Sequence, residues 1–154
     1  MKVAIASDHA GFPAKQIVVK AVKDLGHEVI DFGTNNCDSV DAVDYAAPAS
    51  LAVAGGKAPR GIFICGSGII MCIVANKFKG IRASIAHDIY SAAQGVQHND
   101  MNVLCLGGKV VDNNLIPRLV KSFLEAQFEK GEERLQRRLK KLLDIEAKNM
   151  KQGF

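Results

Sequence analysis

The sequence has no stretch of apolar residues long enough to span a membrane and no secretory signal at its start. A membrane helix needs about 20 consecutive apolar residues, and the apolar runs here are much shorter. Residues 1–8 become polar too early to hold the apolar core of a signal peptide. We therefore expect no membrane partner and a cytoplasmic location.

The chain also lacks the cysteine spacings of metal and redox motifs. Its four cysteines stand at positions 37, 65, 72 and 105, without a C-x-x-C pair and without the spacing of zinc ligands. Reduced thiols are usual in cytosolic proteins. We expect no metal site, and we interpret Cys37, Cys72 and Cys105 as structural.

Aromatic residues are missing where the chain is most basic. The net charge is +4, and many of the Lys and Arg residues lie between positions 130 and 151. Nucleic-acid-binding surfaces typically combine basic side chains with aromatic ones. We interpret this segment as a solvated basic helix and expect no nucleic-acid partner.

The composition is that of one ordinary globular domain. The chain has 154 residues, of which 48% are hydrophobic and 23% charged, enough for a full hydrophobic core. The sequence has no internal repeat, linker or low-complexity segment. We therefore expect a single domain over residues 1–154.

Short apolar runs alternate with helical patterns along the chain. The pattern predicts strands at 3–6, 27–32, 61–65, 81–85 and 101–106, and helices at 12–25, 45–54, 69–76, 87–97, 112–128 and 132–150. Such alternation is typical of an α/β fold with helices on both faces of a parallel sheet. We predict a doubly wound, five-stranded, Rossmann-like sheet with an extra C-terminal helix.

The most informative stretch is residues 61–77. A buried strand ends at Cys65, two glycines interrupt the apolar run, and a buried helix follows from Ile69. The first N–H groups of a helix have no partner within it, so this turn can bind an anion and can activate a thiol placed beside it. Taken alone, the stretch fits a small buried cysteine before an ordinary turn slightly better than an active site.

Two further polar clusters follow predicted strands. Asp8 and His9 follow the first strand, and Gly107, Gly108 and Lys109 follow the last. Ligands of open α/β sheets bind outside the carboxyl ends of the strands. Together with residues 65–67, these clusters predict a polar active site at that edge of the sheet.

Cys65 could take part in the chemistry of such a site in two ways. Cys65 could act as a nucleophile if His9 or His98 lay beside it. It could instead act as a general base, with the N–H groups of residues 66–70 holding the oxyanion that forms.

The remaining candidates each have a simpler alternative. His98 reads as a ligand or as a surface-loop histidine between a helix and a strand, and Tyr45 reads as a ligand-stacking ring or as a core aromatic. Arg134 and Arg138 lie four residues apart and so share a helix face, which suits a phosphate or merely a solvated surface.

Several motifs together resemble one known family, in the same order and over almost the whole chain. They are ASDHAGF at 6–12, VIDFGT at 29–34, DY at 44–45, ICGSG at 64–68, ANK at 75–77, GIRA at 80–83, QHND at 97–100, NVL at 102–104 and RLQRR at 134–138. The chain resembles the ribose-5-phosphate isomerase B family, which also includes the galactose-6-phosphate and allose-6-phosphate isomerases.

The resemblance implies a cofactor-free aldose–ketose isomerase acting on a sugar phosphate. Cys65 would move a proton between C1 and C2 through a cis-enediolate, and His98 would open the furanose ring. The resemblance also implies a homodimer or a dimer of dimers, with active sites at the subunit interface. The implied substrate contacts are Ser67 and the amides of Gly66, Gly68, Ile69 and Ile70 for the enediolate, Asp8 and Asn99 for hydroxyls, and His9, Lys109, Arg134 and Arg138 for the phosphate.

The chain departs from the family pattern at a few positions. Met71 stands where one branch carries a Glu base, which places this chain with the Cys branch. Ile70 replaces a usual glycine, Leu135 a frequent histidine and Lys109 a frequent arginine, and Glu132-Glu133 form an insertion. Beside a pentose-phosphate isomerase, the alternatives are a hexose-6-phosphate isomerase and a weakly active sugar-phosphate-binding subunit.

The predicted last helix carries a leucine stripe at 135, 139 and 142. A separate helix of this kind has little of its own core to pack on. We expect it to dock on a partner subunit and to aim Arg134 and Arg138 at that subunit's site.

Overall fold

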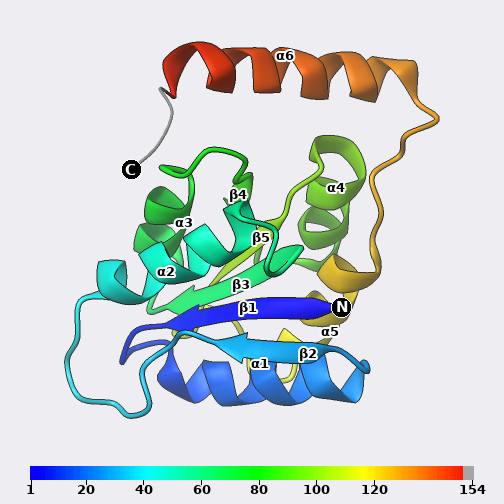
Figure 1. Ribbon diagram of the computed structural model, residues 1–154. Coiled ribbons are helices and arrows are strands. Elements are labelled where there is room, and N and C mark those ends of the chain that lie inside the picture. Colours follow the sequence, from blue (N-terminus) through cyan, green and yellow to red (C-terminus); the bar gives the residue numbers. More distant parts are fainter. Residues whose placement is uncertain (151–154) are drawn as a thin grey trace.

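The computed structural model describes residues 1–150 as strands and helices that alternate along the chain (Figure 1). The strands are β1 (Lys2–Ser7), β2 (Glu28–Asp31), β3 (Arg60–Cys65), β4 (Ala83–Ile85) and β5 (Val103–Gly107). The helices are α1 (Phe12–Asp24), α2 (Ala42–Ala54), α3 (Ile69–Ala75), α4 (Ile89–Asn99), α5 (Ile116–Glu125) and α6 (Glu133–Asn149).

The strands form one parallel sheet in the order β2-β1-β3-β5-β4, which confirms the predicted five-stranded α/β architecture. The register aligns Ser7 with Ile64 and Cys65 with Gly107, so these residues lie at one edge of the sheet. The chain reaches β4 before it returns to fill the place between β3 and β4. This exchange is not visible in the sequence pattern, because both strands are equally apolar.

The two faces of the sheet bury different clusters of side chains. Along β1, Val3 and Ile5 face one side, where they share a core with α1, α4 and α5. Ala4 and Ala6 face the other side, where they pack with α2 and α3. This period of two is the pattern expected of a strand that is covered on both faces.

The helix α6 lies apart from these layers and crosses above α4 and β4 (Figure 1). Leu135 is fully buried within its own chain, whereas Leu142, Leu143 and Ile145 are exposed. The prediction that the whole leucine stripe awaits a partner is therefore wrong for Leu135. The exposed part of the stripe is its C-terminal half.

Several predicted element ends differ from the structure. The helix α2 begins at Ala42 rather than at Tyr45. The helix α5 is shorter than the predicted 112–128: Pro117 lies in its first turn, which begins at Ile116, and the extended conformation of Ala126 ends it after Glu125. The helix α4 starts after Asp88, whose side chain accepts a hydrogen bond from the Ser91 amide. It ends at Asn99 rather than at Gln97, because Asp100 adopts a left-handed conformation with φ 51°.

One lysine is almost completely buried between α1 and the end of β2. The Lys15 ammonium donates to Asp31 Oδ2 at 2.7 Å and to the Thr34 carbonyl at 2.8 Å. These bonds tie α1 to the start of the long loop that follows β2. A buried ammonium requires such partners, because removing the charge from water is costly.

Candidate active site

The three polar clusters predicted from the strand ends meet at one edge of the sheet. The Asp8 amide donates to the Ile64 carbonyl at 3.3 Å, which joins the end of β1 to the end of β3. The Asp8 side chain is buried and accepts a hydrogen bond from the Gly11 amide at 2.8 Å. Asp8 is therefore held beside the turn that follows Cys65.

Cys65 is the last residue of β3 and is only 3% exposed. The Gly68 amide donates to its sulfur at 3.0 Å. Gly68 has φ 82°, a conformation that side chains rarely adopt, and this bend turns the strand into α3. The thiol thus lies inside the turn formed by residues 66–68, with Ile69 and Ile70 exposed just beyond it.

The turn after β5 is hydrogen-bonded to the turn that follows Cys65. The Gly108 amide donates to the Cys65 carbonyl at 2.8 Å, and the Lys109 amide donates to the Gly66 carbonyl at 3.1 Å. A Cβ on Gly66 would lie 3.7 Å from Lys109 Cδ, so the lysine side chain passes over this glycine. Lys109 can therefore bring a positive charge to an anion bound at this edge.

Ser67, His9 and Tyr45 complete the candidates on this side of the molecule. The Ser67 hydroxyl accepts a hydrogen bond from the Ile69 amide at 3.3 Å. His9 Nδ1 accepts one from the Val40 amide at 3.1 Å, so the loop after β2 fixes the ring. Tyr45 is half-buried on α2. No hydrogen bond within residues 1–150 joins Tyr45 to Cys65, so its role stays a prediction.

His98 and Asn99 lie far from this cluster in the same chain. They form the last turn of α4, so the alternative reading of His98 as a loop residue is wrong, and its role at the site stays a prediction. The helix α4 follows the carboxyl end of β4 and runs back to the point where β5 begins. There Val103 is paired with Gly61, four residues before Cys65. Four residues of strand span about 13 Å.

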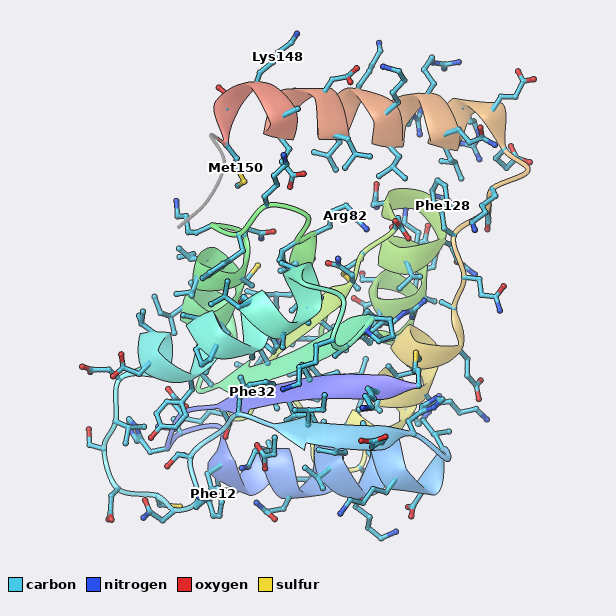
Figure 2. All side chains as sticks on the ribbon, viewed as in Figure 1. Phe12, Phe32, Arg82, Phe128, Lys148 and Met150 are labelled. Carbon is cyan, nitrogen blue, oxygen red and sulfur yellow. The ribbon has the colours of Figure 1, made fainter. Side chains whose placement is uncertain are left out.

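The two arginines of α6 belong to the His98 side of the molecule. The Glu129 amide donates to the Gln97 carbonyl at 2.9 Å, so the segment leading to α6 passes over the end of α4. In Figure 2 the labelled Phe128 marks this passage. His98 Nδ1 lies 3.1 Å from Gln94 Nε2, and its Nε2 lies 3.8 Å from Glu129. Arg134 and Arg138 are exposed on the first turns of α6.

The candidates therefore form two groups that one chain keeps apart. The first group, which we call the cysteine half-site, contains Asp8, His9, Cys65, Gly66, Ser67, Gly68, Ile69, Ile70 and Lys109. The second group, the histidine half-site, contains His98, Asn99, Arg134 and Arg138.

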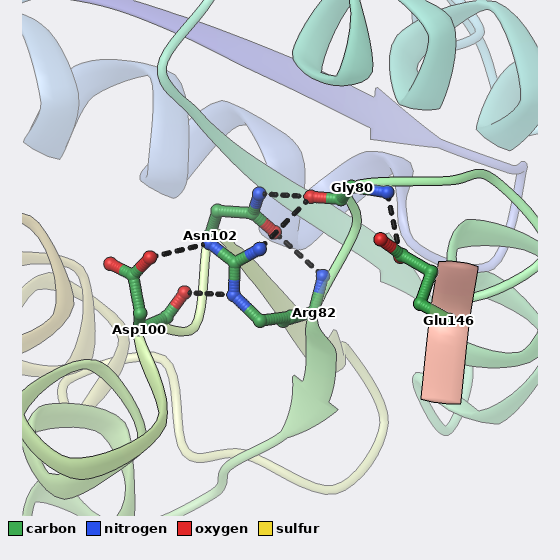
Figure 3. Close-up of polar contacts among 5 residues, drawn as sticks. All are labelled: Gly80, Arg82, Asp100, Asn102 and Glu146. Atoms are coloured by element: carbon green, nitrogen blue, oxygen red, sulfur yellow. Dashed lines mark hydrogen bonds and ion pairs between the residues drawn. The ribbon is translucent and has the colours of Figure 1, made fainter. Parts of the chain in front are cut away.

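A hydrogen-bonded brace, which sequence reasoning missed, holds the histidine half-site (Figure 3). The Arg82 guanidinium donates to the Asp100 carbonyl and to the Asp100 carboxylate, each at 2.7 Å. Asn102 joins both Arg82 and Gly80, and the Gly80 amide donates to Glu146 of α6 at 2.7 Å. The brace thus links the turn after His98 and Asn99 to the helix that carries the two arginines.

A cavity of about 690 Å³ lies between α6 and the edge formed by β4 and α4. Asn99 and Gln94 line it from α4, and Arg82 lines it from the position just before β4. On the α6 side it is lined by Leu142, Leu143 and Ile145, the same apolar residues that α6 leaves exposed.

Cys72, which we interpret as structural, has an unusual electrostatic environment. It is half-buried on α3, and its pKa is lowered to about 7, chiefly by a hydrogen bond with the Cys105 thiol. Burial raises the pKa of Cys105 well above its usual value. Spacing along the sequence gave no sign of this pair, because 33 positions separate the two residues.

Residues 1–150 contain neither a membrane-spanning helix nor a cluster of metal ligands. No helix there is long and apolar enough to cross a membrane. No group of three or more His, Cys, Asp or Glu side chains there could hold a metal ion.

Comparisons with known proteins give one answer. The family model described as Ribose/Galactose Isomerase matches residues 3–142. Ribose-5-phosphate isomerase B of Escherichia coli is 44% identical over 147 residues, 96% of this chain and 97% of that protein. D-erythrulose-4-phosphate isomerase 2 of Mycolicibacterium smegmatis is 39% identical over 132 residues, 84% of this chain and 87% of that protein. A solved ribose-5-phosphate isomerase B from Clostridium thermocellum has a TM-score of 0.92 and 41% identity, covering 97% of this chain and 100% of that one.

Proposed function

This chain belongs to the ribose/galactose isomerase family, and we propose that it interconverts ribose 5-phosphate and ribulose 5-phosphate with Cys65 as the base. As a member of that family it is an aldose–ketose isomerase. The observation that carries the proposal for Cys65 is its position in the turn of residues 65–68. There the Gly68 amide donates to the thiol and the Ile69 amide donates to the Ser67 hydroxyl, at the carboxyl edge of the sheet.

The proton transfer follows from this geometry. Cys65, as the thiolate, removes the proton from C2 of the open-chain aldose, and the released electrons form a C1–C2 double bond while O1 takes the negative charge. The O2 hydroxyl proton passes to O1. The C1–C2 electrons then take the proton back from Cys65 at C1, which leaves the carbonyl at C2. The Ser67 hydroxyl and the amides of residues 66–70 hold the enediolate oxygens, a role typical of such preorganised donors.

The other site residues bind and open the sugar. In the proposal, His98 moves the proton that opens the furanose ring, and Asp8 and Asn99 bind hydroxyls. His9, Lys109, Arg134 and Arg138 bind the phosphate, for which arginine offers a bidentate contact. No metal or other cofactor takes part, and the reaction takes place in the cytoplasm.

We further propose that two copies of the chain complete each active site. His98 lies about 13 Å or more along the sheet from the end that carries Cys65, a gap that a single chain does not close. Ile69, Ile70 and Ile73 are exposed on α3 beside the cysteine half-site, and the groove beneath α6 offers an apolar wall to receive them. A symmetric dimer, alone or paired with a second dimer, would bury both surfaces and place Cys65 of one copy near His98 of the other.

The second candidate function is isomerisation of a sugar phosphate with a shorter or longer carbon chain than ribose. One relative, 39% identical, is named for a four-carbon sugar phosphate, and the description of the family model names galactose. The test is to assay the purified chain, after treatment with EDTA, on erythrose 4-phosphate, ribose 5-phosphate, galactose 6-phosphate and allose 6-phosphate. The proposal expects the highest kcat/KM with ribose 5-phosphate. A higher value with another substrate would reassign the substrate, and no turnover of any of them would refute the proposed activity.

A further inference from the structure

His87 is a histidine to which the proposed mechanism gives no role, and it lies at the edge of the sheet that bears the cysteine half-site. It follows the last residues of β4, and its Nε2 accepts a hydrogen bond from the Gly107 amide at 2.9 Å. The strand β4 ends at Ile85, which is paired with Cys105, two residues before Gly107. The strand β4 is therefore too short to pair with Gly107, and the His87 imidazole accepts the hydrogen bond of the Gly107 amide in place of a backbone carbonyl.

Gly107 is the first residue of the turn that clamps the cysteine half-site. The next two amides, of Gly108 and Lys109, donate to the carbonyls of Cys65 and Gly66. Gly107 also lies directly against Ser67, because a Cβ at Gly107 would come within 2.9 Å of the Ser67 carbonyl group. A shift of Gly107 would thus move the backbone that holds Cys65, Ser67 and Lys109.

The bond to Gly107 exists only when Nε2 carries no proton. A neutral imidazole that accepts at Nε2 carries its proton on Nδ1, whereas a protonated ring donates from both nitrogens and cannot accept. Burial lowers the pKa of His87, and the neighbouring Asp88 carboxylate raises it by less. From the turn itself the charged residue is Lys109, whose side chain passes over Gly66. The ring is therefore neutral at pH 7 and is able to hold the turn.

We propose that His87 is a positioning residue for the isomerisation: as a neutral acceptor it holds the Gly107–Lys109 turn, and its protonation releases that turn from the cysteine half-site. The proposal rests on the function proposed above. It adds a residue that does not touch the substrate and acts through two backbone segments.

The first experiment compares three variants. His87→Ala removes the acceptor, and His87→Gln offers an uncharged carboxamide oxygen at a similar reach. His27→Ala is the control, since the His27 ring lies beside the exposed N-terminus, with Nδ1 3.3 Å from the Met1 ammonium. We expect His87→Ala to lower kcat by about tenfold with a smaller change in KM, because a buried amide loses its acceptor. His87→Gln should restore kcat to within about threefold, and its activity should persist at a lower pH than that of the wild type. Equal kcat in His87→Ala and wild type would overturn the proposal, as would equal losses in His87→Ala and His87→Gln with unchanged pH profiles.

The second experiment does not depend on catalysis. Hydrogen exchange of peptides covering residues 66–69 and 107–110 is measured in the wild type and in His87→Ala at pH 7.5, and in the wild type at pH 5. We expect faster exchange in these two segments in the variant and in the wild type at the lower pH, after correction for intrinsic rates. Faster exchange in a protein without isomerase activity would refute the proposed function. It would still support the role of His87 in holding the Gly107–Lys109 turn. Unchanged exchange would overturn the role of His87 whatever the activity.

Discussion

Cys65 is the residue on which the proposed chemistry depends, and its surroundings make that dependence testable. We expect Cys65→Ala to lower kcat at least a hundredfold, because general base catalysis typically contributes 10²–10⁴-fold. The matched control is Cys37→Ala, since Cys37 is exposed and lies in the loop after β2. Its kcat should equal that of the wild type. The measurement is steady-state turnover of ribose 5-phosphate. A Cys65→Ala enzyme with more than about a hundredth of wild-type kcat would remove Cys65 from the role of base.

At the residue scale, the sequence predicted the side chains that carry chemistry better than the ones that support them. Asp8, Cys65 and Lys109 were predictable because each follows a strand, and parallel strands place their carboxyl ends at one edge. His87 and Arg82 were not predicted as parts of the site. His87 bonds to Gly107, and Arg82 bonds to Asp100. These contacts form because β5 lies next to β4 in the sheet, an order that the sequence does not reveal.

The end of α4, next to the histidine half-site, is closed by Asp100 in a left-handed conformation. Arg82 holds Asp100 in its left-handed conformation through two bonds, one to the carbonyl and one to the carboxylate. We expect Arg82→Lys to lower kcat/KM about tenfold on the furanose substrate, because lysine cannot make both contacts. Turnover of substrate supplied in open-chain form should fall less, since His98 would then not be needed. Arg118→Lys, on the exposed side of α5, is the control. An equal loss on both substrate forms would contradict a positioning effect on ring opening.

The contact between α1 and the end of β2 gives a prediction about stability. Lys15→Met should lower the free energy of unfolding by about 2 kcal/mol, because Asp31 and the Thr34 carbonyl lose their donor. The loss is smaller than for a fully enclosed pair, since the Asp31 side chain is 37% exposed and can turn to water. Lys20→Met is the control, because Lys20 and Asp24 form an exposed pair, worth about 0.5 kcal/mol or less. Chemical denaturation measures both, and equal midpoints for the two variants would show that Lys15 contributes no more than a surface residue.

At the element scale, periodicity predicted which segments are strands and helices, but their ends depend on local bonds. The end of α4 is set by the conformation of Asp100, and its start by the Asp88 cap. The position of β5 between β3 and β4 reflects packing of the complete sheet rather than any one segment. For the same reason, the burial of Leu135 could not be distinguished in the sequence from the exposure of Leu142.

At the scale of the whole molecule, one chain keeps the two groups of proposed site residues apart. The cysteine half-site lies at the carboxyl edge of the sheet, and the histidine half-site lies at the end of α4 and on the first turns of α6, beside a groove that the chain leaves open. The resemblance identified the residues of both groups and implied a site at a subunit interface, whereas periodicity alone does not show that one chain keeps the two groups apart. The two groups are separated because α4 runs back along the sheet, so that His98 lies near the start of β5 whereas Cys65 lies at the end of β3. This separation is the strongest structural reason to expect an active site shared between two copies of the chain.

Mixing two inactive variants tests this shared site most directly. Cys65→Ala and His98→Asn are each purified, assayed alone on furanose ribose 5-phosphate, and then mixed in equal amounts under conditions that let subunits exchange. In a mixed dimer, one site carries both substitutions and the other carries none. Since about half of the dimers are mixed and each has one intact site of two, about a quarter of wild-type activity should return. Activity that never exceeds the average of the two variants measured alone, although mass measurements show mixed dimers, would contradict an active site built from two copies.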